Sequence, residues 1–492
     1  MEQSSELKKR KSWVPWLIFA GSVIIVFILG LFASSIIERR SESKVYFQMV
    51  NKIPDWEPRN QVWGNNFPRE YESYVNTLDT TFKSKYGGSA TRDALQEHPE
   101  MVVLWAGYAF SREYKQSRGH YYAINDIRET LRTDVPQPAT CWTCKSTDVP
   151  RLMNQMGVAN FYKGKWVDLG SEVVNNIGCQ DCHDPKTMNL RITRPALIEA
   201  YQRMGKDITK ATHQEMRSLV CAQCHVEYYF KGEGKYLTFP WDKGMSVEAM
   251  ETYYDSVKHV DFIHALSRAP ILKAQHPDYE QYTTGVHFDR GVACADCHMP
   301  YKRDGGMKFT DHKIQSPLAN IAGSCVVCHR ESEEKLRQNV ISRQDKIQEL
   351  RTIAEKNLAK LHIEAKTAWD NGATELEMEP VLQLIRHAQW RWDYVVASNS
   401  MGFHTPAEAL RILGTSIQKS QEGRLLLNSI LIKHGVKTPV QMPDLSSREK
   451  AQAFIGLDMP ALIKSKEEFI QTVLPEWTKK AVEREGKMIQ PQ

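Results

Sequence analysis

The cysteines of this 492-residue chain have a spacing that could attach a prosthetic group. All ten fall into five pairs of the form C-x-x-C, and none is left over. The pairs are Cys141/Cys144, Cys179/Cys182, Cys221/Cys224, Cys294/Cys297 and Cys325/Cys328. Four of the pairs are followed directly by a histidine, at His183, His225, His298 and His329, whereas the first pair is followed by Lys145.

The pattern C-x-x-C-H is typical of c-type haem attachment, in which two thiols bond to one porphyrin and the next imidazole binds iron. Structural zinc would use such pairs two by two and would leave one over. Disulfides would close very small loops that stabilise little. A thioredoxin-like redox pair would be single and near a βαβ pattern. We therefore expect five covalently bound haem c groups.

The lysine after the first pair, in the segment CWTCK, makes that site different. A lysine amine binds iron only when it is deprotonated, and its pKa falls on burial or beside a cationic centre. We expect Lys145 to be the proximal ligand of a distinct haem, whose other side is open to a substrate. The alternative is that Lys145 lies on the surface and that a histidine elsewhere binds this iron.

The other histidines supply candidates for second iron ligands. A haem with two histidine ligands is six-coordinate, so it transfers electrons and does not bind substrate. Four haems closed in this way need four more of the 16 histidines. The candidates are His120 in SRGHYY, His287 seven residues before Cys294, His312 in DHK and His404 in MGFHTP. Each of them could equally be an ordinary surface or core histidine.

Composition limits the class of protein that carries these sites. The chain has 41% hydrophobic, 25% charged and 10% aromatic residues, which excludes disorder as the main state. A mean hydropathy of −0.48 and a single long apolar stretch exclude a polytopic membrane protein. The net charge is only +5, so we expect no nucleic-acid partner.

The N-terminus predicts a membrane anchor. Four basic residues, 8–11, precede an uncharged apolar stretch, 12–37, which is long enough to span a bilayer. We expect a cytoplasmic tail at 1–12, a transmembrane helix at 13–37 and the rest of the chain in the periplasm. A cleaved signal peptide is the alternative. Arg39 and Arg40 weaken the predicted orientation slightly, whereas export agrees with c-type haem attachment outside the bacterial cytoplasm.

Two further parts follow the anchor. Residues 38–332 carry every haem site and predict short helices and loops, because Pro and Gly are scattered through them. Residues 333–492 predict long helices over 333–369, over 375–397 and from a capping box at Thr405 and Glu408 to a point before Gly435. The fold class is therefore mainly α, a multihaem cytochrome c with a haem-packed core. The long helices either cover that core or form a dimer interface.

The chain beyond the anchor resembles the pentahaem cytochrome c nitrite reductases, which form ammonia. The resemblance lies in CWTCK followed by four C-x-x-C-H sites, and in the segments LWAGYAFSREYKQSRGHYYAINDIRETLRT, CAQCHVEYYF, LKAQHPDYE, TDHKI and GFHTP. It implies that His312 closes the second haem, His120 the third, His404 the fourth and His287 the fifth. It also implies a homodimer.

The resemblance further implies that Arg132, Tyr228 and His276 lie above the haem of Lys145. Arg132 would offer a permanently charged fork to an anion such as nitrite. His276 could donate hydrogen bonds and protons, and Tyr228 could donate a hydrogen bond. Without the resemblance, Arg132 could be a surface ion pair and Tyr228 a core residue.

A calcium ion is also implied next to this pocket. Its ligands would be the side chains of Glu227 and Gln275 and the main-chain carbonyls of Tyr228 and Lys273. Oxygen ligands of this kind suit a hard cation. Such an ion would hold the segments of Tyr228 and His276 and would add positive potential for an incoming anion.

The expected function is the six-electron reduction of nitrite to ammonium, with four bis-histidine haems relaying electrons. A pure electron-carrier cytochrome is one alternative, which CWTCK argues against. A reductase of hydroxylamine or of a sulfur oxyanion is another, although such multihaem enzymes usually carry eight haem motifs. The expected electron donor is a quinol-oxidising multihaem cytochrome. Many members of the family lack a retained anchor, so the predicted one leaves the donor open.

Overall fold

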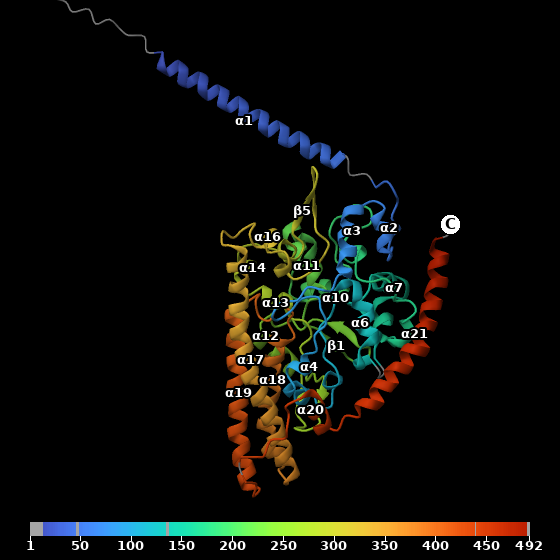
Figure 1. The fold of residues 1–492 in the computed structure, drawn as a ribbon, viewed down its shortest axis with the longest axis vertical. Coiled ribbons are helices and arrows are strands. Elements are labelled where there is room, and N and C mark those ends of the chain that lie inside the picture. The colour runs from blue at the N-terminus through green and yellow to red at the C-terminus, as the bar shows by residue number, and fades with distance from the viewer. Residues whose placement is uncertain (1–12, 46–48, 134–136, 438, 490–492) are drawn as a thin grey trace, which may run out of the picture. The chain divides into compact units, whose positions relative to one another are not determined.

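The computed structural model describes residues 13–45, 49–133, 137–437 and 439–489 (Figure 1). The chain separates into two units, one ending at Lys52 and one beginning at Ile53. The predicted cytoplasmic tail, 1–12, lies outside the described residues.

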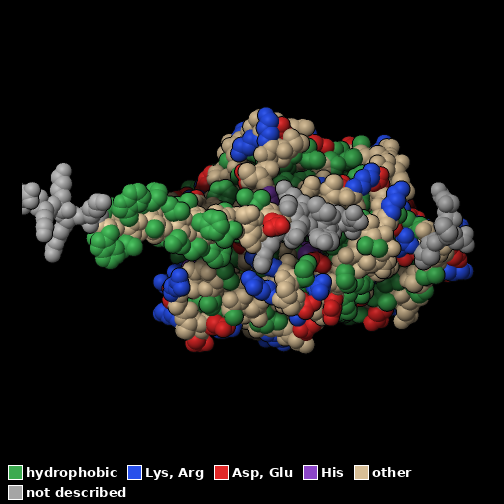
Figure 2. Space-filling model, turned by 90° about the horizontal axis from the view of Figure 1, so that it is seen from above, with side chains coloured by type: hydrophobic (Ala, Val, Ile, Leu, Met, Phe, Trp, Pro, Cys, Tyr) green, Lys and Arg blue, Asp and Glu red, His purple; other side chains and the backbone are tan. Residues whose placement is uncertain are grey.

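The first unit contains a single helix, α1 (Val14–Val45). Its large apolar side chains between Val14 and Ile37 are exposed, and they are green in Figure 2. An 18-residue window within Val14–Glu38 has a mean hydropathy of 2.6, and this stretch could cross a membrane by length and composition, a test that a signal sequence also passes. The helix continues beyond the predicted end at Ile37, because the Glu, Arg and Lys residues that follow are good helix formers.

The first part of the second unit consists of short helices joined by loops. The α-helices are α2 (Asn60–Gly64), α3 (Pro68–Val75), α4 (Ala94–Glu97), α5 (Glu100–Leu104), α6 (Ala123–Glu129), α7 (Asp148–Met156), α8 (Val158–Lys163), α9 (Cys179–Cys182), α10 (Pro195–Arg203), α11 (His213–Ala222), α12 (Val247–Ser256), α13 (Asp278–Tyr282), α14 (Val286–Asp289), α15 (Cys294–His298) and α16 (Ile321–Ser324). The 3₁₀ turns are η1 (Asn76–Leu78), η2 (Ala109–Ser111), η3 (His120–Tyr122), η4 (Leu131–Thr133), η5 (Ala139–Trp142), η6 (Val167–Leu169), η7 (Ile208–Lys210) and η8 (Pro317–Ala319).

Three small antiparallel hairpins interrupt these helices. They pair β1 (Tyr229–Lys231) with β2 (Tyr236–Thr238), β3 (Phe262–Ile263) with β4 (Pro270–Ile271), and β5 (Tyr301–Asp304) with β6 (Met307–Thr310). Two-stranded hairpins of this size are only marginally stable alone, so the surrounding helices and loops must hold them. The predicted mainly α fold is confirmed.

Three long helices, α17 (Glu333–Asp370), α18 (Glu375–Val396) and α19 (Pro406–Lys433), pack against one another at one side of the unit (Figure 1). Their bounds confirm the three predicted helices. The apolar stripe of α17 is buried, including Leu336, Val340 and Ile347. Helix α19 ends before Gly435, whose φ of +75° suits the left-handed residue that follows a helix.

The predicted capping box at the start of α19 is wrong. The Thr405 side chain makes no capping hydrogen bond, and its hydroxyl donates instead to the Thr284 carbonyl at 3.3 Å. The Glu408 carboxylate pairs with Arg411 at 2.6 Å. Both side chains therefore have tertiary or local partners that replace the box. A capping box does form at α18, where Thr374 and Glu377 bond reciprocally.

The long helices share a hydrophobic core with the short ones. Trp392 of α18 lies 5.7 Å from Trp105, which follows α5, between ring centroids. Two more helices complete the chain, α20 (Arg448–Phe454) and α21 (Met459–Ile489). Residues from Ile53 onward therefore cluster as one unit, and the boundary proposed at residue 332 stays a prediction.

Candidate haem-binding cavity and active site

The second unit contains a cavity of about 1940 Å³. Small-molecule pockets usually measure roughly 300–1,000 Å³, and protein interiors otherwise hold few voids larger than a water molecule. All ten cysteines line this cavity, and none of them forms a disulfide. Its size and its lining fit large groups that are attached through thiols.

Local structure places the two thiols of an attachment site on one side of a helical turn. Cys179 and Cys182 delimit α9, and the fourth site forms α15. Residues three apart in a helix share a face, so both thiols of a pair can reach one porphyrin edge. Asp181 fixes its turn by accepting a 2.9 Å hydrogen bond from the Gly178 amide, and Asp296 accepts one from the Ala293 amide at 2.7 Å.

The cavity brings eight predicted iron ligands together in four pairs. The distances between ring centroids are 6.3 Å for His120–His225, 6.2 Å for His183–His312, 6.3 Å for His298–His404 and 6.3 Å for His287–His329. An iron bonded at about 2 Å to one imidazole nitrogen on each side separates the two rings by roughly 6 Å. These are the pairings that the family resemblance implies, and the spacing of each fits a metal between its rings.

The hydrogen bonds of three of these histidines also fit metal binding. Their Nδ1 atoms bond to main-chain carbonyls, at 2.8 Å to Met188 for His183, 2.9 Å to Gln315 for His298 and 2.7 Å to Thr310 for His312. A carbonyl can only accept, so Nδ1 must carry the proton in each ring. The lone pair is then on Nε2, which is the usual arrangement in metal-binding imidazoles.

Burial keeps several of these rings uncharged. It lowers the pKa of His120, of His183 and of His404 to about 4 in each case. A neutral imidazole is the form that binds a metal. The cavity therefore presents ligands that are ready at neutral pH.

The CWTCK segment lies at a different part of this cavity. Lys145 follows η5, is partly buried, and lines the cavity together with Arg132, Tyr228 and His276. In the part of the chain that the structure describes, the Lys145 ammonium has no ion-pair or hydrogen-bond partner. The structure thus brings all four predicted active-site residues to one cavity.

Each of the other three pocket residues has groups available for a small ligand. Arg132 Nε donates to Thr130 Oγ1 at 3.2 Å, and its guanidinium lies 4.4 Å from the Phe110 ring centroid, but no described carboxylate pairs with it. His276 Nδ1 is buried and has no hydrogen-bond partner among the described residues. Burial raises the pKa of Tyr228 well above its usual value, so its hydroxyl stays a donor.

The surroundings of His276 lower the pKa of its imidazole. Burial and the nearby Lys145 ammonium together lower it to about 3. His276 is therefore neutral at physiological pH and carries one N–H and one lone pair. A group of this kind can both accept and donate a proton at the same site.

The predicted calcium ligands also lie together. Glu227 is fully buried, its carboxylate accepts from Tyr254 at 2.8 Å and from the Gln275 amide at 2.6 Å, and no described basic side chain pairs with it. Burial raises the pKa of Glu227 well above its usual value. Gln275 Nε2 donates to the Lys273 carbonyl at 3.1 Å.

These groups can suit a hard cation. The oxygen and nitrogen of a glutamine amide can exchange places by rotation, which would turn Gln275 Oε1 toward the Lys273 carbonyl and Glu227. The donor set would then be oxygen only, as calcium prefers. No described cluster of three or more His, Cys, Asp or Glu side chains has metal-binding geometry, so the set depends on one carboxylate, one amide and carbonyls.

Sequence reasoning missed a buried arginine that joins three attachment sites. Arg194 Nη2 donates to Asp181 at 2.6 Å and to the Ser146 carbonyl at 2.9 Å, and its main-chain amide donates to Gln223 at 3.1 Å. These partners belong to the second, first and third sites, respectively. The only signal in the sequence was the aspartate before the second cysteine in CQDC.

The neighbour of His276 was also missed. Asp278 is buried, and its carboxylate lies 3.6 Å from His225 Nδ1. The carboxylate is held by Ser398 Oγ at 2.8 Å and by the Asn399 amide at 2.9 Å. A carboxylate beside a metal-binding imidazole orients the ring and increases its basicity. The segment AQHPDYE contained this residue, but nothing in its spacing pointed to His225.

Comparisons with known proteins show which proteins this chain is similar to. A family model described as Cytochrome c552 matches residues 59–486. Cytochrome c-552 from Parabacteroides distasonis is 59% identical over 484 residues, covering 97% of this chain and 98% of that protein. Cytochrome c-552 from Porphyromonas gingivalis is 58% identical over 483 residues, covering 96% of this chain and 97% of that protein.

A solved structure is similar as well. It is the catalytic subunit of the cytochrome c nitrite reductase from Desulfovibrio desulfuricans ATCC 27774, which has two calcium sites. The TM-score is 0.73 and the sequence identity 32%, and the match covers 83% of this chain and 91% of that one.

Proposed function

The chain belongs to the cytochrome c552 family, and from this premise we propose that it reduces nitrite to ammonium at the haem attached to Cys141 and Cys144. The reaction takes up six electrons and eight protons and releases two water molecules for each ammonium. The observation that carries the proposal is the pocket around Lys145, where a guanidinium without a carboxylate partner and an imidazole nitrogen without a hydrogen bond, both judged among the described residues, line the same cavity. Haem supplies the redox chemistry when it is bound, and the protein supplies binding, orientation and protons.

Arg132 is proposed to bind the nitrite oxygens. Its guanidinium is always charged and presents its N–H donors in a planar fork that matches a small oxyanion. Its Nε is already held by Thr130, and the stacking on Phe110 restrains the plane of the group. The terminal nitrogens can therefore bind the anion without reordering the side chain.

His276 and Tyr228 are proposed to deliver protons to the substrate oxygens as the N–O bonds break. The neutral His276 ring donates its N–H as a hydrogen bond to the oxygen, and as that proton passes to the substrate the other ring nitrogen takes up a proton from solvent, so the ring stays neutral. Tyr228 keeps its proton because burial raises its pKa, so it acts as a hydrogen-bond donor. Both groups are only partly exposed and face the cavity, which limits competing hydrogen bonds from water.

Lys145 is proposed as the residue that would hold this iron, and the four histidine pairs are proposed to hold the four electron-relaying haems. A haem held by two histidines would have no free position for nitrite and would transfer electrons only. The lysine site alone would keep an open position. Its side-chain nitrogen, which has no partner among the described residues, and its place in the cavity support this role.

We also propose one calcium ion bound by Glu227, Gln275 and the carbonyls of Tyr228 and Lys273. A divalent cation would neutralise the buried Glu227 carboxylate, which has no basic partner among the described residues. It would also fix the segments that carry Tyr228 and His276. Removal of the ion with a chelator is expected to lower nitrite turnover, and added calcium is expected to restore it.

We propose the membrane location from helix α1 and the oligomeric state from the long helices. Helix α1 would anchor the chain in the cytoplasmic membrane, with the second unit in the periplasm and a quinol-oxidising multihaem cytochrome as electron donor. The second unit is proposed to form a homodimer through its long helices. In α19, Leu425 is 73% exposed and Ile432 58% exposed, which supports a covered face. The Leu425→Glu variant should sediment as a monomer if this face is the interface.

The experiment that tests the function measures ammonium formed per nitrite consumed, with haem-loaded protein and a low-potential dye as donor. One ammonium per nitrite is the expected result. Haem-loaded protein that leaves nitrite untouched would favour an electron-carrier cytochrome. If the protein turns over hydroxylamine or sulfite but not nitrite, the result would favour a reductase of hydroxylamine or of a sulfur oxyanion.

A second variant tests the distinct lysine site. Lys145→His should retain haem but lower nitrite turnover strongly, because the site then resembles the other four. Lys163→His, at the exposed end of α8, is the control and should leave both properties unchanged. An unaffected rate in Lys145→His would contradict the proposed role of the lysine.

A further inference from the structure

Helix α21 contacts η4, which carries Arg132, and segments next to the attachment turn of Lys145, although none of its described residues lines the cavity. Its first contact is near its start. Lys466 is 4% exposed, and its Nζ donates to Thr133 Oγ1 at 3.0 Å and to the Arg128 carbonyl at 3.2 Å. Thr133 is the last residue of η4, which carries Arg132. This contact therefore holds the segment that presents the substrate-binding guanidinium.

The second contact is in the middle of α21. Trp477 is buried, and its ring centroid lies 5.3 Å from that of Trp166. Trp166 stacks on Trp142 with centroids 4.9 Å apart, and its carbonyl accepts a 2.9 Å hydrogen bond from Trp142 Nε1. Trp142 lies between the two cysteines of the first attachment site. The packing at Trp477 is close, because a Cβ at Gly170 would lie 2.3 Å from the indole.

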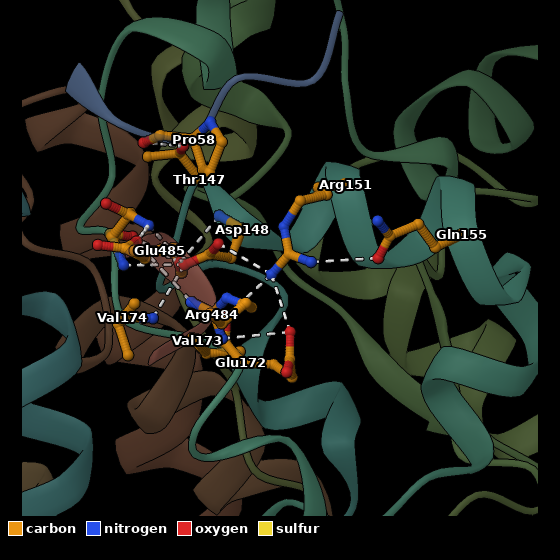
Figure 3. Close-up of polar contacts among 12 residues, drawn as sticks. Pro58, Thr147, Asp148, Arg151, Gln155, Glu172, Val173, Val174, Arg484 and Glu485 are labelled. Carbon is orange, nitrogen blue, oxygen red and sulfur yellow. Dashed lines mark hydrogen bonds and ion pairs between the residues drawn. The ribbon is translucent and has the colours of Figure 1, made fainter. Parts of the chain in front are cut away.

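The third contact is a network of charges near the end of α21, shown in Figure 3. Arg484 pairs with Glu172 at 3.2 Å, and Glu172 also pairs with Arg151 at 3.2 Å. Arg151 in turn donates to Asp148 at 3.1 Å. Glu485 accepts a 2.7 Å hydrogen bond from Asn175 Nδ2.

This network ends three residues after Lys145. Asp148 is fully buried, and its Oδ2 accepts from the main-chain amides of Val174 at 2.9 Å and Asn175 at 2.8 Å. Between Lys145 and Asp148, Thr147 donates to the Pro58 carbonyl at 2.9 Å (Figure 3). Charge-assisted hydrogen bonds of this kind are strong in a buried setting. The backbone that carries Lys145 is therefore fixed from its C-terminal side.

We propose that α21 is a positioning element. It fixes the segment of Arg132 and the segment of Lys145 in position relative to each other. Lys466 acts on the arginine segment, Trp477 on the attachment turn, and Arg484 on the lysine segment. A misplacement of about 1 Å in such a constellation can reduce a rate on the order of a hundredfold. The inference rests on the proposed nitrite reduction, but its test also has a readout that does not depend on turnover.

The test compares Arg484→Gln with Lys480→Gln, which removes the same charge from an exposed position of the same helix. Haem content, the optical and electron-paramagnetic spectra and nitrite kinetics are measured for each variant. Arg484→Gln is expected to keep its haem, to change the spectrum of the lysine-site haem and to lower kcat on the order of tenfold to a hundredfold. Arg484→Lys, which can still pair with Glu172, is expected to recover most of both properties.

Lys466→Met tests the other side of the pocket. It keeps the length of the side chain but removes both hydrogen bonds, so KM for nitrite should rise while the spectrum of the lysine-site haem stays close to wild type. If α21 only adds stability, we do not expect Arg484→Gln to change the haem spectrum and kcat while Lys466→Met changes KM. If Arg484→Gln loses its haem, Lys466→Met and Arg484→Lys still decide the question.

Two results would overturn the proposal. One is a set of spectra and kinetic constants in Arg484→Gln and Lys466→Met that match those of Lys480→Gln. The other is a drop in kcat with KM and the spectrum unchanged in both variants. Failure of the proposed function looks different, because the wild-type protein would then leave nitrite untouched while the spectra of the variants would still report on α21.

Discussion

Histidines pair in two different ways in the second unit. Around the cavity, four pairs of rings lie 6.2–6.3 Å apart between centroids. Where α17 packs on the β3–β4 hairpin, His264 and His362 stack at 3.7 Å, which leaves no space for an ion. His362 bonds to Ser267 Oγ at 2.9 Å and to Gln389 Oε1 at 2.6 Å.

The difference shows what distinguishes a ligand site from a core. In the stacked pair of His264 and His362, each imidazole nitrogen has a hydrogen bond within the protein. His264 Nε2, for example, bonds to the Val103 carbonyl at 2.8 Å. Around the cavity, nitrogens such as His276 Nδ1 have no partner in the protein. Buried polar groups without partners are rare, so they point to a group that completes them. Substitutions near the cavity should change the chemistry, and substitutions in the core should change stability.

The largest effect is expected for His276→Ala. Loss of a proton donor should lower nitrite turnover by about 10²–10⁴-fold. Haem content and thermal unfolding should stay close to wild type, because Nδ1 of this ring has no hydrogen bond within the protein to lose. Steady-state kinetics and the haem absorbance of the same preparation check this. Parallel losses of haem and of activity would mean that His276 supports the fold instead.

A smaller change in activity is expected for His120→Ala, which opens one of the paired sites. The haem at His225 should lose its second ligand and show a new high-spin signal in the electron-paramagnetic spectrum. Turnover should fall less than in His276→Ala, because the substrate pocket stays intact. The exposed His213 also lines the cavity without a paired ring, so His213→Ala is the control. An unchanged spectrum in His120→Ala would contradict the pairing with His225.

A substitution in the stacked pair of His264 and His362 should change stability and leave the haem spectra unchanged. His362→Leu leaves Gln389 and Ser267 without their buried partner, at a cost of about 1–3 kcal/mol for each group. The free energy of unfolding in denaturant should fall accordingly, while the spectra of all haems stay unchanged. Ile353→Ala, at an exposed position of the same helix, should have little effect. A change in the haem spectra of His362→Leu would mean that the two regions are coupled.

The smallest effect is expected from pH. Burial lowers the pKa of His362 to about 4, below the ordinary value of 6.5, so the folded state binds fewer protons than the unfolded chain. The stability that depends on the neutral ring is complete above pH 6.5 and is lost as the pH falls toward 4. A tenfold change in proton affinity is worth about 1.4 kcal/mol, so the neutral His362 ring contributes about 3 kcal/mol over this window. His362→Leu should show a weaker dependence on pH between 6.5 and 4.

Much of this molecule was predictable because the relevant signals are local. The long helices from Glu333 to Lys433 follow from continuous apolar periodicity and from the glycine that ends the last of them. The failure at Thr405 is instructive, because its capping pattern was present and a carbonyl 121 residues away took the hydroxyl instead. Local propensity decides only where no tertiary partner competes.

The candidate site was predictable in part. The resemblance named the four distal histidines, the pocket and the calcium ligands, and the structure brings these groups together without testing their ligation. Arg194 and Asp278 were not found, because their roles depend on partners in distant segments. Nothing in the sequence indicated that α21 reaches the CWTCK segment, since the bonds of Arg484 and Glu485 cross more than 300 residues.

Five C-x-x-C pairs, the one lysine that follows them among four histidines, and the three long helices could all be found from the sequence alone. Covalent chemistry and helical periodicity are written in short spacings, so they need no knowledge of the fold. Only the tertiary structure decided which histidine faces which, and which rings are held apart and which are stacked. Those distances arise from packing between segments that are remote along the chain, and packing is a property of the folded whole.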